Sequence, residues 1–130
     1  MTQHLLIVDD EASILFALQD YFSFKGYRVD CAEDRQSAQA LLANARRAGT
    51  GYDVVVTDLS LNGRDSTDGL DVIEHACAHA PHCRVILLSG NLTKQLEREA
   101  YARGVHGVFN KGIPLPELEI AVAALIGGNS

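Results

Sequence analysis

Apolar residues occur along this chain in two alternating patterns. Short runs that are apolar on both faces, such as the residues from Val54 to Thr57, are typical of strands buried between two layers of helices. Longer segments repeat apolar residues at the period of an amphipathic helix, as at Ile14, Leu18 and Phe22. The first pattern predicts strands at 5–8, 54–58 and 84–89, and two further strands, at 27–32 and 107–111, follow glycines that end helices. The second predicts helices at 12–25, from 34 or 35 to the run 46–49, from 69 to about 80, at about 92–103 and at 117–126.

The alternation of strands and helices predicts an α/β fold with one parallel sheet. A helix between two strands returns the chain so that the second strand runs parallel to the first, through a right-handed connection. Helices then cover both faces, which gives a doubly wound sheet of five strands with five helices. The flavodoxin-like order 2-1-3-4-5 is one of the common solutions, and it makes the first and third strands neighbours. No repeat or linker interrupts the pattern, so residues 1–130 are expected to form one domain.

The composition narrows the class of protein. Hydrophobic residues make up 47% of the chain but aromatic residues only 6%, so the core is expected to consist mainly of aliphatic residues and alanine. The formal net charge of −6 argues against nucleic acid or an anionic membrane as the direct partner. Three cysteines without disulfide spacing, no apolar run of about 20 residues and no signal peptide predict a protein of the reducing cytoplasm. Met1 suggests that the chain starts at its natural beginning.

Polar residues with complementary chemistry stand at the ends of four predicted strands. They are Asp9 and Asp10 after the first strand, Asp58 at the end of the third, Ser89 at the end of the fourth and Lys111 at the end of the fifth. The carboxyl ends of parallel strands meet at one rim of the sheet, where such folds bind their ligands. We therefore expect these side chains to lie close together.

The expected rim has the parts needed for phosphoryl transfer. Three carboxylates in one place repel one another unless a cation joins them, and Mg²⁺ suits them because it prefers hard oxygen ligands. The backbone carbonyl of Ser60, just past the strand, is a further oxygen donor. Beside such a metal, Asp58 can attack phosphorus as a nucleophile. Lys111 and the hydroxyl of Ser89 can then neutralise the phosphoryl oxygens.

At these positions the sequence resembles the receiver domains of two-component response regulators. The likeness covers essentially the whole chain, from residue 5 to residue 125. The matching motifs are the acidic pair after the first strand, Asp58 in VVVTDLSL, Ser89 and Gly90 in VILLSGN, and Lys111 in FNKGIPLPEL. Each motif alone is weak, but four of them in this order at strand ends are a specific signal.

The resemblance implies a phosphoacceptor signalling module and gives each residue of the rim a role. Asp58 would accept a phosphoryl group from a phosphohistidine of a sensor histidine kinase or a histidine phosphotransfer protein, with Mg²⁺ as cofactor. The domain would assist only its own phosphorylation and dephosphorylation, and its output would be altered protein–protein contacts. The implied roles are Mg²⁺ binding by Asp9, Asp10, Asp58 and Ser60, phosphoryl binding by Ser89, Gly90 and Lys111, and tuning of reaction rates by Ser60 and Asn91.

The sequence departs from the family pattern at the expected conformational switch. The family lysine is commonly followed by proline, often through a cis bond, but here Gly112 follows Lys111 and a trans peptide is expected. The position three before the lysine is commonly Tyr or Phe and is Val108 here, while Phe109 should point to the opposite face of the strand. A proline of many members is replaced by Asn62, and the following loop is about three residues longer than usual. We therefore expect phosphorylation to act mainly on the rim loops.

Two other groups of residues suggest a metal site. The zinc candidates are His75, His79, His82 and Cys83, of which the first two share a helix face. They lack a four-ligand spacing of known type, so surface histidines are the simpler interpretation. The calcium candidates are Asp65, Asp68 and Asp71. They lack the glycine and terminal glutamate of an EF-hand loop, and a solvated loop and helix start are expected instead.

A large aromatic residue falls on the solvent face of the first predicted helix. Phe16 lies about 200° around the helix from Ile14, on the side that the core does not use. Together with Leu15 and close to the acidic rim, it is a candidate docking surface for a helical partner. A single exposed apolar residue is also normal at a protein surface.

Three other functions fit parts of the sequence. A phosphohydrolase of the haloacid dehalogenase type needs a second Asp two residues after its nucleophile, where this chain has Ser60. A flavodoxin-like nucleotide binder needs a loop rich in Gly, Ser or Thr, where this chain has Asp9, Asp10 and Glu11. The chain could also be a receiver-like scaffold that binds partners without phosphorylation. The intact set of Asp, Ser and Lys argues against this interpretation, and the altered switch residues argue for it.

Overall fold

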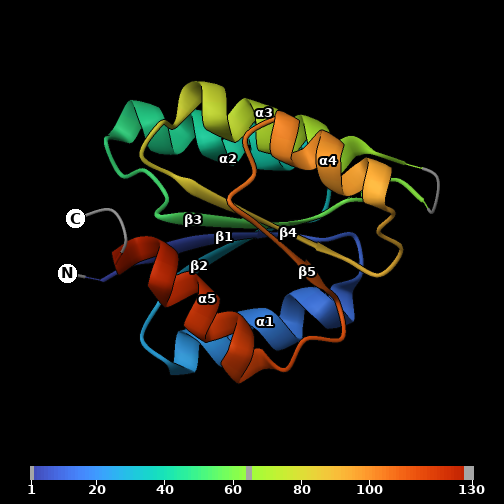
Figure 1. The fold of residues 1–130 in the computed structure, drawn as a ribbon. Coiled ribbons are helices and arrows are strands. Elements are labelled where there is room, and N and C mark those ends of the chain that lie inside the picture. The colour runs from blue at the N-terminus through green and yellow to red at the C-terminus, as the bar shows by residue number, and fades with distance from the viewer. Residues whose placement is uncertain (1, 64–65, 128–130) are drawn as a thin grey trace.

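The strands form one parallel sheet in the predicted order. A computed structural model describes residues 2–63 and 66–127 of the chain. Its strands are β1 (His4–Val8), β2 (Arg28–Ala32), β3 (Val54–Asp58), β4 (Arg84–Ser89) and β5 (Gly107–Asn110). Their order in the sheet is β2-β1-β3-β4-β5, and every neighbouring pair is parallel (Figure 1). The doubly wound fold predicted from the sequence is confirmed.

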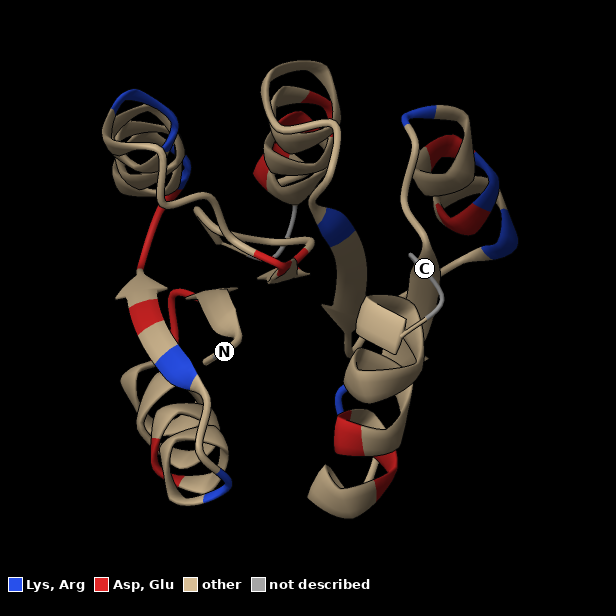
Figure 2. Cartoon of the chain, turned by 90° about the vertical axis from the view of Figure 1, so that its left-hand side faces the viewer, with Lys and Arg blue, Asp and Glu red and all other residues tan. Residues whose placement is uncertain are grey.

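Helices cover both faces of this sheet. They are α1 (Ala12–Phe24), α2 (Arg35–Ala48), α3 (Asp68–His79), α4 (Lys94–Ala102) and α5 (Leu115–Gly127). One face is covered by α1 and α5 and the other by α2, α3 and α4, and Figure 2 gives an end-on view of the same layers. Within the described ranges, no helix is both long and apolar enough to cross a lipid bilayer.

The sheet separates two apolar cores. Side chains alternate along each strand, so Leu6 and Val55 pack under α2, α3 and α4, whereas Leu5 and Val54 pack under α1 and α5. All residues of β1 and β3 are buried because these strands are central and covered on both faces. Burying one such aliphatic side chain contributes roughly 1.5–3 kcal/mol, so this layer fixes the strand ends firmly.

Two helices begin two residues away from their predicted starts. The fourth helix begins at Lys94, two residues later than expected, because the Thr93 hydroxyl accepts a hydrogen bond from the Leu96 N–H at 3.1 Å and caps it. The last helix begins at Leu115, earlier than expected, so that Pro116 lies in its first turn. Proline is tolerated there because the first N–H groups of a helix have no partner within it.

A glycine allows α3 to lie directly against the end of β3. A Cβ atom at Gly69 would collide with the carbonyl oxygen of Asp58 and the Cα of Leu59. The N–H of Gly69 instead donates to the Leu59 carbonyl at 2.8 Å. The end of β3 is therefore held by a backbone contact with α3 as well as by its neighbours in the sheet.

Candidate functional site

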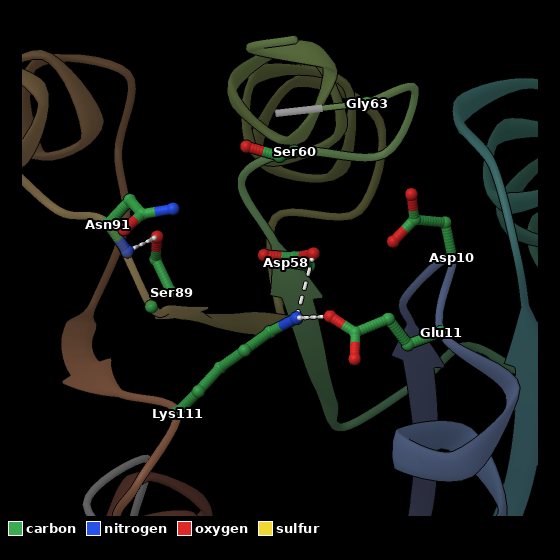
Figure 3. Close-up of a pocket in the computed structure, with 9 residues that line it drawn as sticks. Asp10, Glu11, Asp58, Ser60, Gly63, Ser89, Asn91 and Lys111 are labelled. Carbon is green, nitrogen blue, oxygen red and sulfur yellow. Dashed lines mark hydrogen bonds and ion pairs between the residues drawn. The ribbon is translucent and has the colours of Figure 1, made fainter. Parts of the chain in front are cut away.

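The carboxyl ends of the strands surround a pocket of about 310 Å³ that is open to solvent. Of the predicted rim residues, those that line it are Asp10, Asp58, Ser60, Ser89, Gly90, Asn91 and Lys111. Figure 3 shows Asp10 on one side of the pocket, Ser89 and Asn91 on the other, and Asp58 between them. Asp9 is 2% exposed and lies behind the lining, where its carboxylate reaches Lys111. The structure thus brings together every residue of the predicted rim.

Asp58 ends the central strand β3 and is only 5% exposed. Burial raises the pKa of the Asp58 carboxyl above its usual value, while hydrogen bonds from Lys111 and from the backbone N–H groups of Ser60 and Leu59 act to lower it. These bonds orient the carboxylate and leave it facing the pocket (Figure 3). Asp58 therefore presents an oriented, largely buried carboxylate at the floor of the pocket.

Three carboxylates lie close enough to hold one metal ion. One oxygen of each of Asp9, Asp10 and Asp58 lies within 4.8 Å of the others. Asp9 and Asp58 are buried, whereas Asp10 is exposed at the pocket mouth. Burial, and then the neighbouring Asp58, raise the pKa of Asp9, although the Glu11 N–H and Lys111 act to lower it. All three potential ligands are carboxylate oxygens, and a cation between them would reduce their mutual repulsion. Such a ligand set suits a small, hard divalent cation.

Lys111 contacts three carboxylates at once. Its Nζ lies 3.0 Å from Asp58 Oδ2, 3.1 Å from Asp9 Oδ2 and 3.1 Å from Glu11 Oε1. Burial acts to lower the pKa of Lys111, but the hydrogen bonds to these carboxylates outweigh burial and raise it. The lysine is therefore a permanent cation at the centre of an acidic site.

Glu11 is a site residue that the sequence reasoning missed. Its carboxylate lines the pocket and meets Lys111, which lies 100 positions further along the chain (Figure 3). Its backbone N–H donates to Asp9 Oδ1 at 2.9 Å. The only signal in the sequence was a third acidic residue after the acidic pair, which reads equally well as the start of a helix.

The opposite wall of the pocket is neutral and polar. Ser89 ends β4, is 2% exposed, and its Oγ accepts a hydrogen bond from the Asn91 N–H at 3.3 Å. Gly90 and Asn91 are exposed at the mouth, and Ser60 is half-buried after β3. The wall therefore offers a hydroxyl, an amide and an open glycine backbone, and no acidic side chain.

The residues of β5 point as predicted. Val108 packs against the core beneath α2, α3 and α4, whereas Phe109 packs on the other side of the sheet with α1 and α5. The ring of Phe109 therefore does not replace an aromatic side chain at position 108. No cis peptide bond occurs in residues 2–63 and 66–127, so the bond after Lys111 is trans as expected.

The candidate docking residues on α1 differ in exposure. Phe16 is 71% exposed, as its position on the helix predicts. Leu15 is half-buried and packs against the core under α1 and α5. The aromatic ring is thus the main apolar feature of this part of the surface.

The zinc and calcium candidates make ordinary structural contacts in the part of the chain that the structure describes. The rings of His75 and His79 pack with centroids 4.4 Å apart, and the Cys83 thiol is buried. Within residues 2–63 and 66–127, the carboxylate trio of the pocket is the only group of three or more potential ligands, so the zinc interpretation has no support there. Of the calcium candidates, Asp65 lies outside the described residues, and Asp68 and Asp71 form ion pairs with Arg35.

Comparison with known proteins agrees with this geometry. A model of the response regulator receiver domain family matches residues 5–123. Transcriptional regulatory protein ComA of Bacillus subtilis (strain 168) is 24% identical over 108 residues, which cover 82% of this chain and 48% of ComA. Transcriptional regulatory protein AruR of Pseudomonas aeruginosa is 37% identical over 65 residues, which cover 50% of this chain and 27% of AruR. A CheY-like response regulator receiver domain protein from Methanospirillum hungatei JF-1 has a similar crystal structure, with a TM-score of 0.88, 19% identity, and coverage of 99% of this chain and 97% of that one.

The chain belongs to the response regulator receiver domain family, because the family model matches nearly its whole length. Receiver domains of two-component systems are phosphoacceptor signalling modules, and phosphorylation by a kinase is their standard function. Receiver domains take phosphoryl groups from histidine kinases or phosphotransfer proteins. The chain spans half or less of the length of the two curated relatives.

Proposed function

We propose that Asp58 is the phosphoacceptor of this receiver domain. The observation that carries the proposal is the position of its carboxylate, which ends the central strand, lines the pocket, and lies 3.0 Å from Lys111 Nζ. The donor is a phosphohistidine of a sensor histidine kinase or of a histidine phosphotransfer protein. A phosphohydrolase of the haloacid dehalogenase type needs a second Asp two residues after its nucleophile. This chain has Ser60 there, which argues against that function.

The transfer forms one bond and breaks one. A carboxylate oxygen of Asp58 attacks the phosphorus, the phosphorus–nitrogen bond to the donor histidine breaks, and the ring nitrogen leaves with the electron pair and takes up a proton. Hydrolysis reverses the modification when water attacks the same phosphorus and Asp58 leaves as a carboxylate. Both steps are helped by groups that neutralise the phosphoryl oxygens.

Asp9, Asp10, Asp58 and the carbonyl of Ser60 would hold Mg²⁺ in this site. When bound, the ion neutralises charge on the phosphoryl oxygens and reduces the repulsion between the carboxylates. The donor set supports this assignment, because every side-chain ligand is a carboxylate oxygen within 4.8 Å of the other two. Asp10, which is exposed at the pocket mouth, would bind the ion directly.

Ser89, Gly90 and Lys111 would bind the phosphoryl group. Lys111 supplies an ammonium that already touches the acceptor, and Ser89 a hydroxyl on the facing wall (Figure 3). Gly90 lines the pocket and has no side chain, so a phosphoryl group could approach its backbone closely. Ser60 and Asn91 flank this position and would tune the access of the attacking water.

Intact-mass analysis tests the acceptor. The protein is incubated with Mg²⁺ and acetyl phosphate, and one added phosphoryl group is expected. Asp58→Asn should lose this gain, and EDTA should slow it by about tenfold or more because the phosphoryl charge is then less well neutralised. Asp53→Asn is a matched control at the other end of β3 and should keep the gain. The same mass gain in Asp58→Asn, or no effect of EDTA, contradicts the assignment.

A further inference from the structure

We propose that Glu11 is a positioning residue that restrains Lys111 in the unphosphorylated protein and makes the site discriminate between phosphodonors by their charge. The inference rests on the proposed acceptor role of Asp58. It assigns to Glu11 a function in that reaction beyond the start of a helix.

The donor capacity of Lys111 is fully used before any phosphoryl group arrives. An ammonium group has three N–H donors, and Nζ of Lys111 has three carboxylate oxygens within 3.1 Å. A phosphoryl oxygen that binds Lys111 must therefore displace one of them. Asp9 and Asp58 are buried, whereas the Glu11 side chain is 58% exposed. Glu11 is the partner that can be released to water at the lowest cost, so it competes most directly with the phosphoryl group.

Glu11 also sets the charge that an incoming donor meets. Among residues 2–63 and 66–127, the pocket and its floor contain four carboxylates, those of Asp9, Asp10, Glu11 and Asp58, and one ammonium group, that of Lys111. A bound divalent cation offsets two more of these charges and leaves one negative charge in excess. The charge of Glu11 lies at the mouth of the pocket, opposite the neutral wall of Ser89 (Figure 3). A doubly charged donor is therefore repelled more strongly than a singly charged one.

The side chain of Glu11 is dispensable for the fold around it. Glu11 is the N-cap residue of α1, but its side chain makes no capping hydrogen bond. Its backbone carries the structural contacts, with the N–H on Asp9 Oδ1 and the carbonyl accepting from Ile14 and Leu15. Replacing the carboxylate by an amide keeps this backbone and removes only the charge.

The test compares Glu11→Gln with Glu33→Gln in the whole chain at saturating Mg²⁺. Glu33 is exposed just after β2 and does not line the pocket, so it controls for net charge. Rates of Asp58 phosphorylation are measured by intact mass with dianionic acetyl phosphate and monoanionic phosphoramidate. Glu11→Gln should raise the acetyl phosphate rate about threefold or more, and the ratio of the two rates about twofold or more. At about 0.5 M salt, where the Debye length is about 4 Å, this change in ratio should shrink.

The outcomes separate this inference from the proposed function. Equal rate ratios in wild type and Glu11→Gln, or the same change in Glu33→Gln, overturn the role of Glu11 while leaving Asp58 as the acceptor. A wild-type protein that gains no phosphoryl group on Asp58 overturns the proposed function itself. A variant that merely damaged the fold would slow both donors alike and would lower the thermal midpoint, which also counts against the inference.

Discussion

A few neighbouring groups compensate the negative charge of Asp58. A carboxylate that is 5% exposed would normally be destabilised in its charged form, and its pKa is indeed raised by burial. Lys111 compensates at 3.0 Å, and the backbone N–H groups of Leu59 and Ser60 add further donors. Substitutions beside these groups are therefore expected to change rates while the acceptor itself remains intact.

Ser60 and Asn91 are expected to set the lifetime of the phosphoryl group. Both line the pocket, and both are small and uncharged, so neither offers acid–base help to the attacking water. Ser60→Gln and Asn91→Glu should each change the dephosphorylation rate by about two- to tenfold without blocking phosphorylation. The rate is measured as the loss of the added mass after the donor has been removed.

The control for charge is Gln95→Glu, an exposed change on α4 that does not line the pocket. It should leave the lifetime unchanged. If both pocket variants also keep the wild-type lifetime, the placement of Ser60 and Asn91 beside the phosphoryl group is wrong.

Helix α1 combines two features at the end that faces the rim. Its N-cap residue Glu11 contacts Lys111, and Phe16 in its second turn is 71% exposed. The inward side of the same helix is fixed by Leu18 and Phe22, which are buried in the core. A partner that brings a phosphohistidine to the pocket would approach next to this exposed ring.

We expect Phe16→Ala to slow phosphotransfer from the protein partner by about fivefold, because an apolar anchor at an interface core contributes about 1 kcal/mol or more. Phosphorylation by acetyl phosphate should be unchanged. Phe24→Ala is the matched control, since this ring is 86% exposed at the other end of α1. Equal slowing with both donors would show damage to the fold instead of a docking role.

At the scale of the whole molecule, ion pairs connect the helices α2, α3 and α4 that cover one face of the sheet. Arg103 at the end of α4 pairs with Asp71 of α3 at 3.1 Å, and the same carboxylate accepts from Arg35 of α2 at 2.9 Å. Each of these partly exposed pairs contributes only roughly 0–1 kcal/mol, but together they connect three helices. Val108, which packs against the core under these helices, has a stiff β-branched side chain and no ring to move. The change on phosphorylation is therefore expected to stay near the rim.

Amide chemical shifts with and without beryllofluoride test this expectation. Large changes should be confined to residues 60–67, 90–93 and 111–114, and residues 97–108 should change little, because the usual ring contact is missing. Val108→Tyr restores a ring at this position and should extend the changes into α4 and β5. Large changes throughout 97–108 in the wild type would falsify the proposed confinement.

The sequence by itself determined the fold and most of the site. Runs apolar on both faces identified the three inner strands β1, β3 and β4, since strands covered on both faces need such runs, and short segments after helix-ending glycines identified the edge strands β2 and β5. Because strands joined through helices run parallel, their carboxyl ends meet, and this placed Asp9, Asp10, Asp58, Ser89 and Lys111 at one rim. These are local or topological rules, so a single sequence contains the information they need.

Only the tertiary structure decided the contacts between side chains from distant segments. Glu11 meets Lys111 across 100 positions of sequence, and no periodicity relates the two. Leu15 is half-buried because of how α1 lies on the sheet, a packing angle that the helix pattern does not encode. Such contacts follow from the positions of whole elements in space, which the order of residues fixes only through the complete fold.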